Sequence, residues 1–140
     1  SMTLETTQEI TSRTLTADVN RELREWQQQI PNSTSAYNHG AKFMSLLTQA
    51  MQRGYDFKLE LEQKPPESLA GFAQVAEQPD GTWVVSVAKT KSLLRRPTVK
   101  VAAIPARGEI DIFAVGTETP DFTAVLPIAQ VKSISFSAPQ

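Results

Sequence analysis

The chain contains no cysteine, a single histidine and no long apolar run. The absence of cysteine excludes disulfide bonds, thiolate nucleophiles, and zinc or iron–sulfur sites built on thiolates. One histidine and scattered carboxylates make a poor ligand set, so we expect no metal and no cofactor. No window approaches the roughly eighteen apolar residues of a membrane-spanning helix, so we expect no contact with a membrane.

Several catalytic and targeting signals are also missing. The sequence holds no glycine-rich phosphate loop, no serine nucleophile elbow and no Walker motif, and its six glycines fall largely in expected turns. Residues 3–16 contain no apolar run of the kind that a signal peptide needs. Together with the lack of cysteine, this favours a cytoplasmic protein.

What is present is the ordinary balance of one soluble globular domain. The chain has 140 residues, of which 40% are hydrophobic and 21% charged. A chain of this length buries roughly two-thirds of the surface that its extended form would expose, so it can form a core without covalent staples. We therefore expect a single domain over residues 16–140.

The N-terminal third predicts an arm followed by a helix. Residues 1–15 are polar and rich in threonine, which is typical of a flexible arm. Beyond them, apolar residues recur at spacings of three or four and line one helix face: Val19, Leu23, Trp26 and Ile30. They predict a helix over 17–30 that Thr16 caps and Pro31 ends.

A second helix is predicted over 34–53. Asn32 or Ser33 can accept its first free backbone N–H groups, and Gly54 suits the left-handed residue after its end. The predicted apolar stripe consists of Tyr37, Ala41, Met44, Leu47 and Met51, and Phe43 and Ala50 widen it. The short link between the helices favours an antiparallel pair or an L.

From residue 55 onward the spacing of apolar residues changes from a period of 3.6 residues to one of 2, which predicts strands. The predicted strand over 68–77 follows this pattern less regularly. Turn residues at 78–81 and 105–108 predict two hairpins, and Pro127 must lie at an edge, a bulge or a bend. Helices followed by adjacent strands predict an α+β fold. In it, two N-terminal helices pack on a mainly antiparallel sheet of about five to seven short strands, and a small β-barrel preceded by helices is the alternative.

Positive charge is concentrated in one stretch of the chain. Residues 81–108 contain no acid and six bases: Lys89, Lys91, Arg95, Arg96, Lys100 and Arg107. Arginine and lysine side chains bind carboxylates and phosphates, so these residues are the predicted partner-binding surface. The alternative is that they pair across the sheet with acids of the chain itself: Asp56, Glu60, Glu62, Glu109 and Asp111.

No catalytic residue is predicted. For the single histidine, His39, the sequence identifies neither a hydrogen-bond partner nor a nucleophile that it could activate. We expect it at the surface or at the boundary between surface and core. Two acid pairs, Glu60 with Glu62 and Glu109 with Asp111, lie about 7 Å apart by strand geometry, near the spacing used in two-carboxylate hydrolysis. Acids that alternate with apolar residues are, however, typical of any half-exposed strand.

Three functions remain open. The first is a non-catalytic adaptor or assembly protein that binds an acidic protein surface through residues 89–107. The second is a nucleic-acid-binding small barrel that stacks bases on Trp83 or Tyr55, although an acidic chain is an awkward nucleic-acid binder. The third is a small-ligand protein with a pocket between helices and sheet, lined by Trp26, Tyr37, Met44 and Phe72.

A homo-oligomer is compatible with all three functions. The last predicted strand, over 128–136, carries Lys132 as its one charge. An edge strand with so little charge can pair with a second copy unless another element covers it.

Overall fold

The computed structural model describes residues 5–71, 73–87, 98–115 and 122–138. Two helices, α1 (Thr7–Gln27) and α2 (Thr34–Gln52), precede seven strands in two antiparallel sheets. The predicted α+β fold is confirmed, and within the described residues the sheets do not close into a barrel. Segments far apart in the sequence meet in one sheet, as residues 56–61 and 131–137 do.

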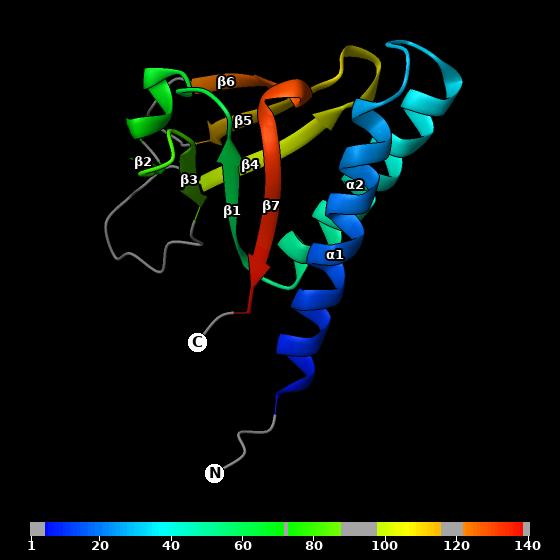
Figure 1. Ribbon diagram of the computed structural model, residues 1–140. Coiled ribbons are helices and arrows are strands. Elements are labelled where there is room, and N and C mark those ends of the chain that lie inside the picture. The colour runs from blue at the N-terminus through cyan, green and yellow to red at the C-terminus, as the bar shows by residue number, and fades with distance from the viewer. Residues whose placement is uncertain (1–4, 72, 88–97, 116–121, 139–140) are drawn as a thin grey trace.

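The first sheet, sheet A, has four strands in the order β2 (Gln74–Glu77), β3 (Trp83–Val87), β1 (Asp56–Leu61) and β7 (Val131–Ser137). The second, sheet B, has three in the order β4 (Thr98–Ile104), β5 (Glu109–Val115) and β6 (Phe122–Pro127). Short 3₁₀ turns lie between them: η1 (Glu67–Gly71), η2 (Pro105–Arg107) and η3 (Ile128–Gln130). In Figure 1, β4 and β5 cross behind β1 and β7 at a steep angle, β6 lies at the top of the view, and both helices lie on one side.

The buried faces of both sheets and both helices form one hydrophobic core. Leu59 and Leu61 enter it from sheet A, and Ile110 and Ile112 from sheet B, because alternate residues of a strand point to opposite faces. The helices contribute larger side chains, and the Trp26 ring lies 5.5 Å from the Phe43 ring, centroid to centroid.

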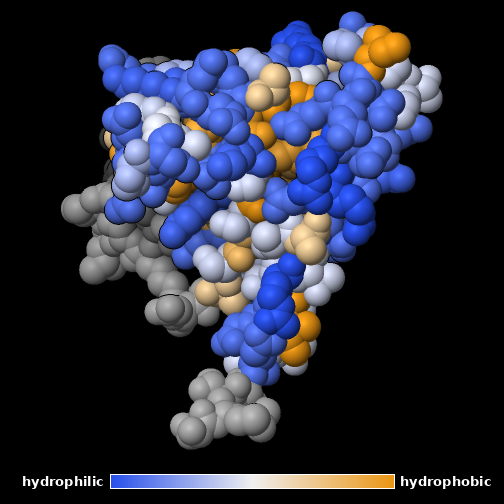
Figure 2. Space-filling model, viewed as in Figure 1, coloured by the Kyte–Doolittle hydropathy of each residue, from blue (hydrophilic) through white to orange (hydrophobic). Residues whose placement is uncertain are grey.

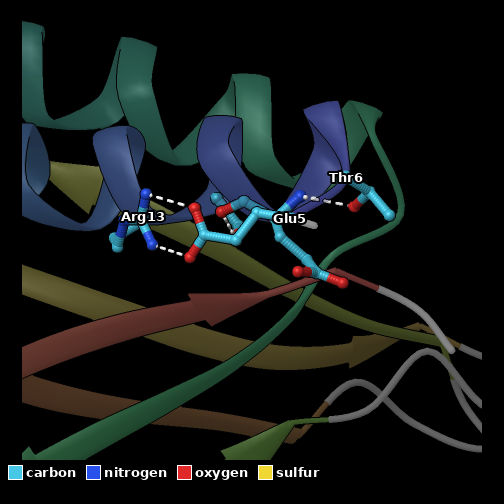
Figure 3. A network of polar contacts seen from close by, with 5 residues as sticks. Glu5, Thr6 and Arg13 are labelled. Atoms are coloured by element: carbon cyan, nitrogen blue, oxygen red, sulfur yellow. Dashed lines mark hydrogen bonds and ion pairs between the residues drawn. The ribbon is translucent and has the colours of Figure 1, made fainter. Parts of the chain in front are cut away.

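Helix α1 begins at Thr7, so the predicted cap at Thr16 and the unstructured arm over 1–15 are wrong for its described part. Thr6 is the N-cap, and its hydroxyl accepts from the backbone N–H of Glu9 at 3.1 Å. Figure 3 shows the two-pronged ion pair that joins Glu5, just before the helix, to Arg13. The hydrogen bond from this guanidinium lowers the pKa of the Glu5 carboxyl.

The first turns of α1 are also held by the rest of the molecule. The Tyr55 hydroxyl donates to the backbone carbonyl of Gln8 at 3.2 Å, and Leu15 is buried in the core. The threonine-rich composition that suggested an arm is thus outweighed by packing, which supplies most of the stability of helices in proteins.

The end of α1 also differs from the prediction. Val19, Leu23 and Trp26 are buried as predicted, but the helix ends at Gln27. Ile30 lies beyond it and is 78% exposed, so its place in the apolar stripe was wrong.

Helix α2 matches its predicted range closely, with Ser33 as the N-cap. Phe43, Leu47 and Ala50 of the predicted stripe are buried, but Tyr37 and Ala41 are exposed, so that part of the prediction was wrong. The buried residues are Ala36, Gly40, Phe43, Leu47 and Ala50, whereas Tyr37 is 56% exposed. A Cβ added at Gly40 would lie 2.7 Å from Cβ of Pro105 in η2. Small residues thus mark the contact face of α2 because the backbones approach closely there.

The hairpin predictions are confirmed. Strands β2 and β3 pair across residues 78–81 and β4 and β5 across 105–108, with positive φ at Gly81 and Gly108. The predicted strand over 68–77 forms only at Gln74–Glu77, and η1 occupies its first part. Pro127 ends β6, which pairs with β5 alone among the described strands, and η3 follows it directly, so Pro127 lies at an edge and a bend as predicted.

Helix α1 covers the free edge of β7. The Asn20 side chain accepts from the Ile134 backbone N–H at 2.9 Å and donates to the carbonyl of the same residue at 2.7 Å. The Phe136 backbone N–H donates to the Thr16 hydroxyl at 3.0 Å. At the other end of the strand, the Gln27 amide donates to two further carbonyls.

These bonds give the edge backbone the partners that a neighbouring strand would provide. The edge of the last strand, which could pair with a second copy if nothing covered it, is therefore occupied by α1 at Ile134 and Phe136.

Candidate functional site

Two of the six predicted cations, Lys100 and Arg107, belong to the part of the chain that the structure describes. Lys89, Lys91, Arg95 and Arg96 lie outside the described residues. Lys100 is near the start of β4, whereas Arg107 lies in the turn after it. Because a strand rises about 3.3 Å per residue, the span from Lys100 to Ile104 alone is about 13 Å. The two cations therefore lie toward opposite ends of the β4–β5 hairpin.

Their electrostatic surroundings differ as well. The Lys100 side chain is exposed and forms no ion pair with any described residue. Nη1 of Arg107 lies 3.8 Å from Oε1 of Glu109, and the Arg107 side chain is 74% exposed. An ion pair this exposed contributes little to stability, but it means that Arg107 already has a carboxylate of the same chain beside it.

The outer face of sheet B carries the acid pair Glu109 and Asp111 among apolar neighbours. Both side chains point away from the core, since the residue between them, Ile110, is fully buried. The residues directly opposite them on the two neighbouring strands are apolar: Ile104, Pro127, Ala102 and Val125.

These surroundings shift the titration of Glu109. The hydrogen bond to the Asp111 side chain, burial and the negative charge of Asp111 raise the pKa of Glu109, against the smaller opposing effect of Arg107. Oδ1 of Asp111 is buried, and no hydrogen-bond donor of a described residue reaches it. Glu109 therefore favours its protonated form more than an ordinary glutamate does.

Glu60, on the outer face of sheet A, is by contrast well supplied with partners. Its carboxylate accepts from the Ser133 hydroxyl at 3.2 Å and from the Thr82 hydroxyl at 3.4 Å, and Nζ of Lys132 lies 3.5 Å away. The Thr82 hydroxyl and backbone N–H also bond to Asp80, which holds the pKa of Asp80 below its ordinary value. This network joins β1 and β7 of sheet A to the turn between β2 and β3.

His39 has a partner that the sequence did not indicate. Its Nδ1 lies 2.7 Å from Oε2 of Glu22 on α1, and the two side chains are 22% and 13% exposed. No hydroxyl of a described residue hydrogen-bonds to His39, so the pair lacks the nucleophile of a catalytic dyad. The arrangement joins the two helices.

Three of the four predicted pocket residues, Trp26, Tyr37 and Met44, belong to the described part of the chain, and their surroundings differ. Trp26 is enclosed in the core, and Met44 packs at β4, where its sulfur accepts from the Ala103 backbone N–H at 3.1 Å. Tyr37 is more than half exposed, and Phe72 lies outside the described residues.

The two aromatic residues considered for base stacking, Tyr55 and Trp83, do not form an exposed surface. Tyr55 is 4% exposed, and Trp83 is half-buried with Nζ of Lys64 5.7 Å from its ring centroid. Their place against the core agrees with the alternation of the strands.

A hollow that sequence reasoning missed lies between α1, the end of β1 and the start of β7. Its volume is about 410 Å³, and it is lined by Arg24, Gln27, Glu62, Ile128, Ala129, Val131 and Lys132. Figure 2 shows its apolar floor, in orange, between hydrophilic residues of the helix and of the sheet. The lining residues come from distant segments, and only the position of Gln27 beside the apolar stripe of α1 hinted that this side chain faces the sheet.

Within the described ranges, no three histidine, aspartate or glutamate side chains converge on a point that would hold a metal ion. The described helices include none with the length and apolar character needed to cross a membrane. Comparisons with protein-family models, with curated proteins and with solved structures found no match for this chain.

Proposed function

We propose that this chain is a non-catalytic adaptor or assembly protein that binds an acidic protein partner through cations of residues 89–107. The observation that supports the proposal is Lys100, an exposed cation on the outer face of sheet B with no ion pair among the described residues. Its sequence neighbours Lys89, Lys91, Arg95 and Arg96 carry charge of the same sign, with no acid among them.

An unpaired surface cation is suited to this role. It gains an electrostatic partner on binding without first breaking an ion pair within its own chain, and it steers an acidic partner toward the surface. Arg107 contributes less to the proposed surface, because Glu109 already lies beside it and because the hairpin separates it from Lys100.

The test measures binding of a fluorescein-labelled oligoglutamate peptide of about twelve residues to the full chain by fluorescence anisotropy. We expect Lys100→Glu and the double change Arg95→Glu with Arg96→Glu each to weaken binding by about tenfold or more, and added salt to weaken it further. Arg107→Glu should have a smaller effect.

Lys58→Glu is the matched control, because Lys58 is an exposed lysine on the outer face of sheet A and the change in net charge is identical. Equal losses in Lys58→Glu and Lys100→Glu would contradict a localised surface. Tighter binding of a single-stranded oligonucleotide than of the peptide would contradict the choice of partner and favour nucleic acid.

A further inference from the structure

The hollow between α1 and the start of β7 has an apolar floor and a charged rim (Figure 2). Ile128 and Val131 are 9% and 2% exposed and form part of its lining. A volume of about 410 Å³ lies within the usual range of small-molecule sites, which is about 300–1,000 Å³. Size and apolar lining therefore fit a small organic ligand.

Opposite charges line this hollow without meeting. Arg24, on α1, and Glu62, just after β1, are both exposed, and neither forms an ion pair with any described residue. Lys132, at the same rim, already has Glu60 at 3.5 Å. The rim thus offers one free guanidinium and one free carboxylate on different sides of an apolar floor.

Gln27 adds a polar atom of fixed position. Its Nε2 donates to the backbone carbonyls of Ile128 at 2.6 Å and Val131 at 2.8 Å, which holds the side chain against the sheet. These bonds leave its Oε1 without a partner among the described residues, so it can accept a hydrogen bond from a ligand.

We propose that this hollow binds a small zwitterion with an apolar body, that is, a free α-amino acid with an apolar side chain. The ligand carboxylate bonds to the guanidinium of Arg24, which suits a planar two-oxygen acceptor. Its ammonium group bonds to Glu62 and to Oε1 of Gln27. Its side chain lies on Ile128 and Val131. This site is separate from residues 89–107 and does not depend on the proposed function.

The test is an amide-detected NMR titration of the full chain with L-leucine. Because the hollow is open on one side, we expect a dissociation constant in the millimolar range. Saturable shifts should be confined to amides of the hollow, around residues 24–27, 62 and 128–132. Two analogues separate the contributions: 4-methylpentanoate lacks the ammonium group, and 3-methylbutylamine lacks the carboxylate. Each should bind about tenfold more weakly than leucine or worse.

Variants assign the two charges. Arg24→Gln and Glu62→Gln should each weaken leucine binding about tenfold, whereas Arg21→Gln, which removes a cation of α1 outside the hollow, should leave it unchanged. Ala129→Trp should block binding by filling the rim. Thermal unfolding of each variant shows whether the fold is intact.

Three results would overturn the proposal. One is the absence of saturable shifts with leucine at concentrations of tens of millimolar. Another is equal affinity for 4-methylpentanoate and leucine, which would assign no role to Glu62. The last is a loss in Arg21→Gln as large as that in Arg24→Gln, because it would show attraction by general surface charge only.

Discussion

Glu60 and Glu109 occupy similar positions on two sheets, yet their surroundings are opposite. Each is the first acid of an acid-x-acid pattern and points outward from an inner strand of its sheet. Glu60 has hydroxyl donors from two neighbouring strand regions and a lysine within 3.5 Å. Glu109 has Ile104 and Pro127 beside it and a second carboxyl group as its hydrogen-bond partner.

The difference shows that cross-strand neighbours, not the pattern along the strand, decide what a surface carboxylate contributes. On sheet A the Glu60 carboxylate joins β1 to β7 and to the turn before β3, and it stabilises the fold. On sheet B a similar pattern places like charges together in an apolar face, which is unfavourable once both are ionised. In sheet A, side chains of α1 also bond to the backbone of the β7 edge at Ile134 and Phe136.

The largest expected effect comes from the covered edge of sheet A. Asn20→Ala removes both bonds to Ile134 and leaves a half-buried N–H and carbonyl without their partner. We expect a loss of about 1–3 kcal/mol in the free energy of unfolding, slightly reduced by the higher helix propensity of alanine. Urea unfolding measures it.

Asn38→Ala is the control for this substitution, because Asn38 is an exposed asparagine of α2. If the two variants had equal stability, the side chains of α1 would not be the partners that sheet A needs at its edge.

A smaller loss is expected for Glu60→Ala. The substitution leaves Ser133 and Lys132 without their acceptor, but water reaches this face and replaces part of the bonding. We expect a destabilisation of about 1 kcal/mol by urea unfolding. Glu62→Ala, two residues along the same face, should be within about 0.5 kcal/mol of the unmodified chain. A larger loss in the free energy of unfolding for Glu62→Ala than for Glu60→Ala would show that Glu62, and not Glu60, is the stabilising carboxylate.

The smallest effect has the opposite sign. Glu109→Gln should stabilise the chain by about 0.5–1 kcal/mol at neutral pH, because it removes one of two like charges from the apolar face of sheet B. A carboxyl whose pKa is raised in the folded state contributes stability at low pH, and that stability is lost as the pH rises through the raised pKa. The gain in Glu109→Gln should therefore shrink as the pH is lowered and vanish below the ordinary value of 4.5.

Urea unfolding between pH 4 and pH 8 measures this profile, with Glu25→Gln as an exposed control on α1. A gain that does not change with pH would indicate that Asp111 and burial do not shift the titration of Glu109. The two glutamates would then differ in packing alone.

Prediction from the sequence succeeded where the signal is local. Glycine and proline specify the two tight turns, and the change of apolar period marks where the strands begin. These two signals were enough to predict the order of elements and the α+β class. The candidate site was predicted less well. The six cations were identified by composition, but the distance between Lys100 and Arg107 depends on the length of the β4–β5 hairpin, and the partner of Arg107 depends on the turn that brings Glu109 beside it.

Local chemistry thus determined the helices, the hairpins and the alternation of buried and exposed residues, because backbone preference and side-chain spacing act over a few neighbouring positions. Tertiary structure decided where α1 begins and which face α2 buries around Gly40. It also decided that α1 bonds to the β7 edge and that Glu60 and Glu109 have opposite surroundings. Each of these depends on atoms brought together from distant segments. A hydrogen bond or a close backbone contact needs both partners within a few ångströms, and only the packed chain supplies the second one.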